Sequence, residues 1–156
     1  MFLLVWNCRG FGNLRTKDQL AELVWPKNPS VVFIAETWTD KDRIVQVQRW
    51  IDFKNMLEVP QRNKARGLVI FWNEDFDLSI ETFSPNHIDS TINKNKENEW
   101  RFTTFYGEPD MRFRHESWTK LCNLKNRNYS HWICAGNFNE ITCQSEKTSG
   151  RVIPHN

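Results

Sequence analysis

The sequence predicts an α+β fold of two β-sheets with helices on their outer faces. Short apolar or alternating segments follow one another closely in the middle of the chain, which is typical of antiparallel hairpins. Helical patterns separate the strands near both ends, as crossover connections do, and together these two observations indicate paired sheets covered by helices. With 156 residues, 39% of them hydrophobic, the chain is long enough for a single domain over residues 1–156 with one substantial core.

The first half of the chain begins with a short apolar run, Phe2–Asn7, closed by turn-forming residues. A helical pattern follows, with Thr16 as its expected N-cap and Pro26 as its stop. Ser30–Trp38 is apolar and rich in β-branched residues, which predicts a strand buried on both faces. Residues 39–50 then predict a short helix that leads into a basic loop.

The second half of the chain contains most of the predicted strands. Four of them are expected at Gly67–Trp72, Phe76–Phe83, His87–Ile92 and Trp100–Gly107. A helix follows, in which Trp118, Leu121 and Cys122 recur at helical spacing, and His131–Asn139 is the last strong strand. We expect most of the buried core to come from five strands, at Phe2–Asn7, Val31–Glu36, Gly67–Trp72, Trp100–Tyr106 and Trp132–Ala135.

Composition and charge exclude several classes of protein. A formal charge of +2 is too small to indicate nucleic-acid binding by itself. The four cysteines form no CxxC pair and no zinc pattern, so we expect reduced, mostly buried thiols in an intracellular protein. The N-terminal apolar run has no basic segment before it and is too short for a signal peptide or a membrane span. No membrane and no obligate protein partner is implied.

Five polar residues fall at the ends of predicted strands: Asn7, Glu36, Tyr106, Asn137 and Asn139. Sheets collect functional groups at the carboxyl ends of their strands, where side chains are held rigidly at the edge of a crevice. An Asn after a strand is also a common turn former, and Tyr106 suits an amphipathic core position. Glu36 is more informative, because a carboxylate directly after a buried strand needs a partner such as a metal cation.

These residue types suit one kind of chemistry. Mg²⁺ prefers oxygen ligands and keeps several waters, so one or two carboxylates are enough to bind it. Amide side chains can then position a phosphate and a water molecule, and a tyrosine hydroxyl can donate a hydrogen bond to a phosphate oxygen. The set is therefore typical of a metal-assisted phosphodiesterase.

Several stretches of the sequence, in order, resemble one known superfamily. They are WNCRGFGN, FIAETW, GLVIFW, WRFTTFYGEPD followed by SWTKL, and WICAGNFNEI followed by EKTSG. The pattern runs from the first residue to about Gly150. It resembles the endonuclease/exonuclease/phosphatase superfamily, and in particular the endonuclease domain of plant LINE-type non-LTR retrotransposons. The resemblance implies a four-layer α/β/β/α sandwich like that of deoxyribonuclease I, Mg²⁺-dependent cleavage of DNA, and a nuclear location for a protein that acts on DNA.

The resemblance also implies roles for single residues. Asn7 matches an Asn near the phosphate and the metal, and Glu36 matches the metal-binding Glu. Tyr106 matches a Tyr that contacts the phosphate. Asn139 matches the second polar residue of a Gly-Asp-Phe-Asn motif, which supports the water and the phosphate. Asn137 stands where that motif has Asp, the residue thought to orient or deprotonate the attacking water.

A second departure from the family pattern concerns its closing Ser-Asp-His motif. None of His87, His115, His131 or His155 follows a Ser-Asp pair, and His87 heads a predicted strand, which favours a structural role. We therefore expect a sandwich that is incomplete at its C-terminus and lacks its last third. Weak or lost Mg²⁺ binding, impaired activity, an unpaired sheet edge and an exposed apolar patch should follow.

Three functional hypotheses follow from these matches and departures. The first is a Mg²⁺-dependent phosphodiesterase, ancestrally a DNA-nicking endonuclease of a retrotransposon, with activity impaired by Asn137 and by truncation. The second is a catalytically inactive remnant of a retroelement. The third is a small-molecule phosphatase of the same fold, against which the stretches CRGFGN and FNEI argue.

Overall fold

The computed structural model describes residues 1–60, 67–125 and 131–140. Its first sheet has four strands in the order β1-β2-β4-β3. These strands are β1 (Leu3–Asn7), β2 (Val31–Ala35), β3 (Asn55–Val59) and β4 (Leu68–Trp72). β1 and β2 are parallel, and the other neighbours in this sheet are antiparallel.

The second sheet also has four strands, in the order β5-β6-β7-β8. They are β5 (Leu78–Ser84), β6 (His87–Ile92), β7 (Trp100–Tyr106) and β8 (Trp132–Asn137). β5, β6 and β7 form an antiparallel meander, and β8 returns parallel to β7 after a helical crossover. This is the arrangement of central hairpins and terminal crossovers that the sequence predicts.

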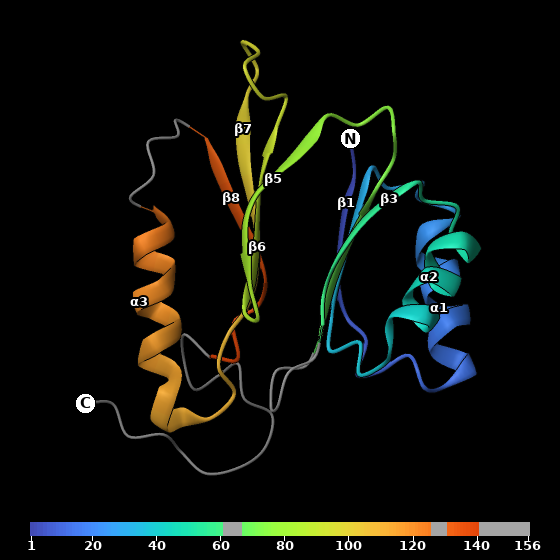
Figure 1. Cartoon of the computed structure of the whole chain (residues 1–156), viewed down its shortest axis with the longest axis horizontal. Helices are drawn as coiled ribbons and strands as arrows, with labels where there is room; N and C mark the ends of the chain where they lie inside the picture. The colour runs from blue at the N-terminus through green and yellow to red at the C-terminus, as the bar shows by residue number, and fades with distance from the viewer. Residues whose placement is uncertain (61–66, 126–130, 141–156) are drawn as a thin grey trace.

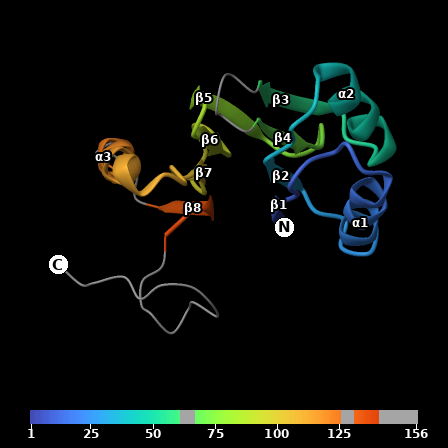
Figure 2. The same cartoon turned by 90° about the horizontal axis from the view of Figure 1, so that it is seen from below.

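Helices cover the outer face of each sheet. α1 (Leu14–Val24) and α2 (Lys41–Trp50) lie against the first sheet, and α3 (Arg114–Lys125), preceded by the 3-10 turn η1 (Met111–Phe113), lies against the second. Figures 1 and 2 show the two sheets facing each other between these helices. The predicted α+β, four-layer α/β/β/α sandwich is confirmed. None of the helices in the described ranges is long and apolar enough to cross a membrane.

The start of α1 differs from the prediction. Asn13, not Thr16, is its N-cap, because the Oδ1 atom of Asn13 accepts a hydrogen bond from the backbone N–H of Arg15 at 2.9 Å. Asn and Thr are both good caps, so composition alone does not choose between them. The expected basic loop before β4 contains the strand β3, whose mixed sequence NMLEV has no clear alternation, since only Val59 is fully buried.

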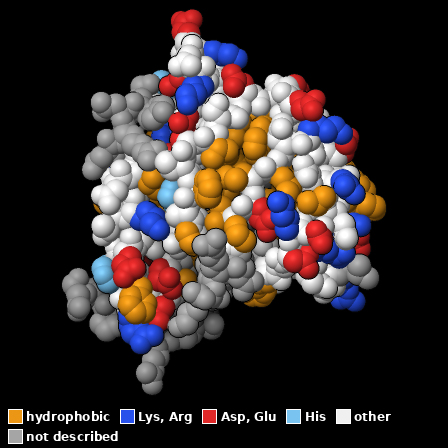
Figure 3. All heavy atoms as spheres, in the orientation of Figure 1, with side chains coloured by type: hydrophobic (Ala, Val, Ile, Leu, Met, Phe, Trp, Pro, Cys, Tyr) orange, Lys and Arg blue, Asp and Glu red, His pale blue; other side chains and the backbone are white. Residues whose placement is uncertain are grey.

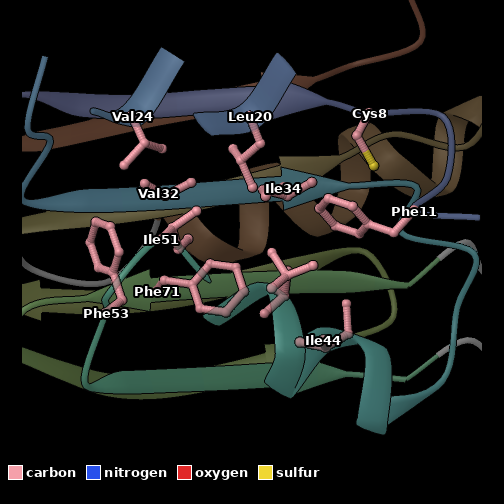
Figure 4. Packing of buried hydrophobic residues seen from close by; sticks show 12 residues of the cluster. Cys8, Phe11, Leu20, Val24, Val32, Ile34, Ile44, Ile51, Phe53 and Phe71 are labelled. Atoms are coloured by element: carbon pink, nitrogen blue, oxygen red, sulfur yellow. The ribbon is translucent and has the colours of Figure 1, made fainter. Parts of the chain in front are cut away.

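Two hydrophobic clusters form the core. One lies between the first sheet and its helices, where Val32 and Ile34 of β2 meet Leu20 of α1 and Ile44 of α2 (Figure 4). The other lies between the sheets and contains Val31 and Phe33 from the opposite face of β2. Because both faces are covered, all five residues of β2 are buried, as the apolar run predicts.

The edge strands β1 and β8 correct part of the core prediction. Both were expected to be core strands, yet the residues of β1 are half-buried and Ile133 of β8 is 48% exposed. β1 has a neighbour in its sheet on one side only, and so does β8, within the described residues. The two strands contact each other across the sandwich.

Figure 3 shows hydrophobic side chains gathered between the two sheets on the face in view.

α3 also packs differently from the prediction. The buried residues of α3 are Ser117, Leu121 and Leu124, whereas Trp118 is 47% exposed and Cys122 is exposed. The surface below α3 explains this choice, because it is polar rather than apolar. Arg101 and Asp89 are fully buried there and form an ion pair, so this face of the second sheet does not require a wide apolar stripe on the helix.

Candidate active site at the carboxyl ends of the strands

Parallel pairing brings the predicted polar residues to one end of the sandwich. Asn7 of β1 lies opposite Ala35 of β2, so Asn7 and Glu36 leave their strands at the same edge. Tyr106 of β7 lies opposite Asn137 of β8 in the second sheet. The carboxyl ends of these four strands lie at the lower end of both sheets in Figure 1, where β1 contacts β8.

Glu36 is the central side chain of the site. It is 5% exposed, and its Oε1 atom accepts a hydrogen bond from the Tyr106 hydroxyl at 2.6 Å. The same oxygen accepts a longer bond, 3.3 Å, from the Nδ2 group of Asn7. Tyr106 belongs to the second sheet, so this contact joins the two halves of the sandwich. The backbone of Glu36 has φ 60°, an uncommon conformation for a residue other than glycine.

The second oxygen of interest is Oδ1 of Asn7. This atom is buried and accepts no hydrogen bond from any described residue. A buried acceptor without a donor costs about 1–3 kcal/mol, so such atoms in native proteins usually face a water or an ion. The Nδ2 group of the same side chain donates to Glu36, so this acceptor without a donor belongs to the side chain that contacts the carboxylate.

A small cavity of about 90 Å³ lies between the edges of the two sheets. Its described lining consists of Val5, Trp6, Asn7, Phe33, Ala35, Gly136 and Asn137. Asn7 of the first sheet and Asn137 of the second therefore line the same cavity. None of these lining side chains titrates, so they include no group that can take up a proton near neutral pH.

Asn137 and Asn139 belong to a hydrogen-bonded turn after β8. The Oδ1 atom of Asn137 accepts a hydrogen bond from the backbone N–H of Asn139 at 2.9 Å. The Nδ2 group of Asn139 donates to the carbonyl of Gly107 at 2.6 Å, and the ring of Phe138 stacks on Phe105 with 5.6 Å between centroids. Asn139 thus supports the loop, and only Asn137 of the pair lines the cavity.

Gly136 is a feature whose role the sequence reasoning missed. It has φ 151°, and a Cβ atom there would lie 1.8 Å from the carbonyl oxygen of Phe105 on β7. Any side chain would push β8 away from β7 and move Asn137 out of the cavity. A glycine directly before the polar residue at a strand end is the signal that could have identified it.

The resemblance implies a Mg²⁺ site, and the side chains at this edge can be compared with what such a site requires. Within the described ranges, no three His, Cys, Asp or Glu side chains gather closely enough to hold a metal. Among the described side chains at this edge, the Glu36 carboxylate and the orphaned Oδ1 of Asn7 are the oxygen donors that a metal could share. This pair suits Mg²⁺, which binds through one carboxylate and neutral oxygens with several waters, and does not suit a zinc site.

Cys8 follows Asn7 but does not suit a nucleophilic role. Its side chain is buried, and its Sγ atom donates to the carbonyl of Glu36 at 3.4 Å. Burial raises the pKa of the Cys8 thiol to about 11, so it stays neutral at physiological pH. Cys8, Cys122 and Cys134 are free thiols, but the expectation of mostly buried thiols is wrong for these three, since Cys8 is buried, Cys134 is half-buried and Cys122 is exposed. Cys143 lies outside the described residues.

Other polar features lie apart from this cavity. His87 is buried at the start of β6 and pairs with Ser84, whose Oγ atom lies 2.7 Å from its Nδ1 atom, as a structural residue does. An open cleft of about 790 Å³ follows β3 and the start of α2, with Glu58 and Lys41 in its lining. It shares no described residue with the cavity at Asn7 and Asn137.

Comparison with known proteins identifies a family. A family model described as "Endonuclease/Exonuclease/phosphatase family" matches residues 4–149. No curated protein shows significant sequence similarity to the chain.

Solved structures match the fold at low sequence identity. The endonuclease domain of TRAS1, a telomere-specific non-LTR retrotransposon, superposes with a TM-score of 0.63 and 16% identity over 90% of this chain and 61% of that one. The 3' phosphatase NExo from Neisseria, bound to a product DNA hairpin, gives 0.66 and 14% over 92% and 60%. A humanized TDP2 from D. rerio gives 0.66 and 14% over 90% and 66%. The chain therefore spans about three fifths to two thirds of the length of these proteins.

Proposed function

The chain belongs to the endonuclease/exonuclease/phosphatase family, and we propose its function from that membership. On this premise, Asn7, Glu36, Tyr106 and Asn137 form a site that binds Mg²⁺ and a phosphodiester of DNA. Hydrolysis at this site is strongly reduced relative to a family member with Asp in place of Asn137. A domain of this family, ancestrally a DNA-nicking endonuclease of a retrotransposon, accounts for both the fold and the residue types.

One observation carries the proposal. Oδ1 of Asn7 is a buried oxygen without a hydrogen-bond donor, and it belongs to the side chain that donates to Glu36. A cation beside these two groups would satisfy the orphaned oxygen and neutralise the buried carboxylate together. A purely structural Asn at the end of a strand would instead turn its oxygen toward a backbone N–H or toward solvent.

Each residue has a definite task in this site. Glu36 and Asn7 would hold the ion, which when bound stabilises the charge that develops on the phosphate. The hydroxyl of Tyr106 fixes the orientation of the Glu36 carboxylate. Because the Oδ1 atom of Asn137 already accepts from Asn139, its Nδ2 group remains as a donor toward the cavity. That group can position a phosphate or a water molecule, but it cannot accept a proton.

The absence of a carboxylate at position 137 determines the rate of hydrolysis that we expect. Loss of a general base typically lowers the rate by about 10²–10⁴-fold. A second candidate function, a family member that binds DNA without cleaving it, is favoured by the loop after β8, whose hydrogen bonds are formed while position 137 carries no carboxylate. DNA as the ligand is supported by the DNA present in the NExo structure and by the retrotransposon origin of the TRAS1 domain. A nuclear location would follow from a DNA substrate.

The test combines nicking of supercoiled plasmid with Mg²⁺-dependent binding of a short labelled duplex. We expect no nicking above background by the wild-type chain, and none by Asn137→Asp alone, since these 156 residues contain no Ser-Asp-His sequence. Mg²⁺ should nevertheless tighten duplex binding by the wild type and not by Glu36→Gln. Plasmid nicking by the wild type that Glu36→Ala abolishes would show a working nuclease and overturn the reduced rate. Binding that ignores both Mg²⁺ and Glu36 would overturn the site itself.

A further inference from the structure

Asn86 binds the backbone of Tyr106, the last residue of β7, with two hydrogen bonds. The N–H of Tyr106 donates to the carbonyl of Asn86 at 2.7 Å, and the carbonyl of Tyr106 accepts from the Nδ2 group of Asn86 at 3.1 Å. Asn86 lies in the turn between β5 and β6, one residue before β6 pairs with β7 at His87 and Phe105. Asn86 therefore extends the hydrogen bonding between the two strands to the residue that carries the Tyr106 side chain.

Lys120 of α3 determines which way the amide of Asn86 faces. Its Nζ atom donates to the Oδ1 atom of Asn86 at 3.1 Å and to the Oγ atom of Ser84 at 3.5 Å. An ammonium group donates and does not accept, so it selects the amide oxygen and leaves the Nδ2 group for the carbonyl of Tyr106. Lys120 is half-buried, and burial lowers the pKa of its ammonium group, so the charge is held there against a cost of desolvation.

The backbone of Tyr106 in turn determines where its hydroxyl lies. This hydroxyl donates to Glu36 at 2.6 Å, across the space between the two sheets that Figure 1 shows. A small rotation of the Tyr106 backbone would move the far end of the ring away from the carboxylate. The next residue, Gly107, donates its N–H to the carbonyl of Asn137 at 2.8 Å, so the same stretch of backbone also supports the other sheet edge of the cavity.

We propose that Asn86, oriented by Lys120, is a positioning residue that holds the hydroxyl of Tyr106 against Glu36 and so sets the geometry of the Mg²⁺ site. This inference rests on the proposed function and adds residues outside the cavity on which the site depends. Functional side chains need such support, because they act only when neighbouring groups lock their orientation. Loss of an outer partner of a metal ligand typically weakens metal binding by about 10–100-fold.

Fluorine NMR can test the proposal, because the chain has two tyrosines, Tyr106 and Tyr129. The variant Tyr129→Phe, labelled with fluorotyrosine, gives one signal from Tyr106 and is the reference protein. In it, Glu36→Gln should shift the metal-free signal, which marks the contact between hydroxyl and carboxylate. In Asn86→Ala, Glu36→Gln should shift the signal much less, and Mg²⁺ titrations followed by the signal should show about tenfold weaker binding.

Variants of Lys120 test the orienting role of its charge. Lys120→Met should change the signal and the Mg²⁺ affinity as Asn86→Ala does, to a smaller extent. Lys120→Arg should restore the reference behaviour, because a guanidinium group can also donate to the oxygen of Asn86. Lys125→Met is the matched control, since Lys125 is an exposed lysine of the same helix, and it should behave as the reference protein.

Two results would overturn the proposal. If Glu36→Gln shifts the signal of Asn86→Ala as it shifts the reference, and Mg²⁺ affinity is unchanged, Asn86 supports only the fold, even where thermal stability falls. Should Asn86→Ala not fold, the same comparison in Lys120→Met decides. If Lys120→Arg behaves like Lys120→Met, the orienting role of the charge is wrong. A reference signal that Mg²⁺ does not move would instead contradict the proposed function, and the metal-free comparison of Asn86 with Glu36 would still decide the positioning of Tyr106.

Discussion

Glu36 is a carboxylate that is almost fully buried, and the contacts around it determine what this end of the molecule can do. Asn7 and Tyr106, which donate to its Oε1 atom, come from different sheets, so this part of its stabilisation requires the assembled sandwich. Hydrogen bonds to a charged group contribute about 1.5–3 kcal/mol each, which offsets part of the desolvation of the carboxylate. The site and the contact between the sheets are therefore energetically linked.

The raised pKa values of two thiols, Cys8 and Cys134, should lower the stability of the protein at high pH. Burial raises the pKa of Cys8 and of Cys134 from the ordinary value of 9.0 to about 11. Between these values the unfolded chain loses thiol protons that the folded chain retains, so the free energy of unfolding should fall as the pH rises from 9 to 11. Urea titrations across this range should show that Cys8→Ala/Cys134→Ala loses less stability than the wild type. Parallel pH profiles of the two proteins would contradict this.

At the scale of secondary-structure elements, one polar network joins β6, β7, β8 and α3. Arg101 of β7 forms two hydrogen bonds with Asp89 of β6, at 2.8 and 2.9 Å, and a third with the carbonyl of Leu124 in α3. Thr103 donates to Asp89 at 2.6 Å and accepts from the indole N–H of Trp132 on β8 at 2.9 Å. This network takes the place of an apolar layer below α3.

Breaking this network should destabilise the fold strongly. Asp89→Asn would remove the carboxylate that pairs with the buried Arg101 guanidinium, and the loss of one partner of a buried pair costs about 3–5 kcal/mol. Chemical denaturation should show this loss. Lys96→Ala is the control, since its ion pair with Asp77 lies at the surface and should contribute at most about 1 kcal/mol. Equal losses for the two variants would show that the buried pair is not important for stability.

Elements with a strong pattern could be predicted from the sequence, and those shaped by tertiary context could not. The apolar run at β2 and the alternation at β5 specify a strand whatever surrounds them. β3 was missed because an edge strand with one buried residue, Val59, leaves no periodic signal. The buried face of α3 was misassigned because a helix that packs on Arg101 and Asp89 need not bury Trp118.

At the scale of the whole molecule, the two sheets leave apolar groups partly exposed along their edges. β1 and β8 are the last described strands of their sheets on one side, and Ile133 of β8 is nearly half exposed. Edge strands with apolar side chains promote association between molecules. We expect Ile133→Lys to reduce aggregation in light scattering at unchanged circular dichroism, and Ile133→Val to behave as the wild type. Identical aggregation of all three proteins would show that Ile133 does not belong to the surface through which the molecules associate.

Less of the candidate site than of the fold could be predicted from the sequence. The residue types and their common position after strands indicate Asn7, Glu36 and Asn137, because parallel strands place their carboxyl ends together. The hydrogen bond from Tyr106 to Glu36 and the orphaned Oδ1 of Asn7 depend on how the two sheets face each other. No periodicity in the sequence encodes that relation.

The most direct test of the account is the affinity for Mg²⁺, measured by isothermal titration calorimetry on four proteins. Asn137→Asp keeps an acceptor for the N–H of Asn139 and adds a negative charge beside the cavity, so it should bind Mg²⁺ at least about tenfold more tightly than the wild type. Glu36→Gln should abolish binding, and Glu58→Gln, in the separate cleft along β3, should leave the affinity unchanged. Equal affinities of the wild type and Asn137→Asp, or undiminished binding by Glu36→Gln, would show that these residues do not form a metal site.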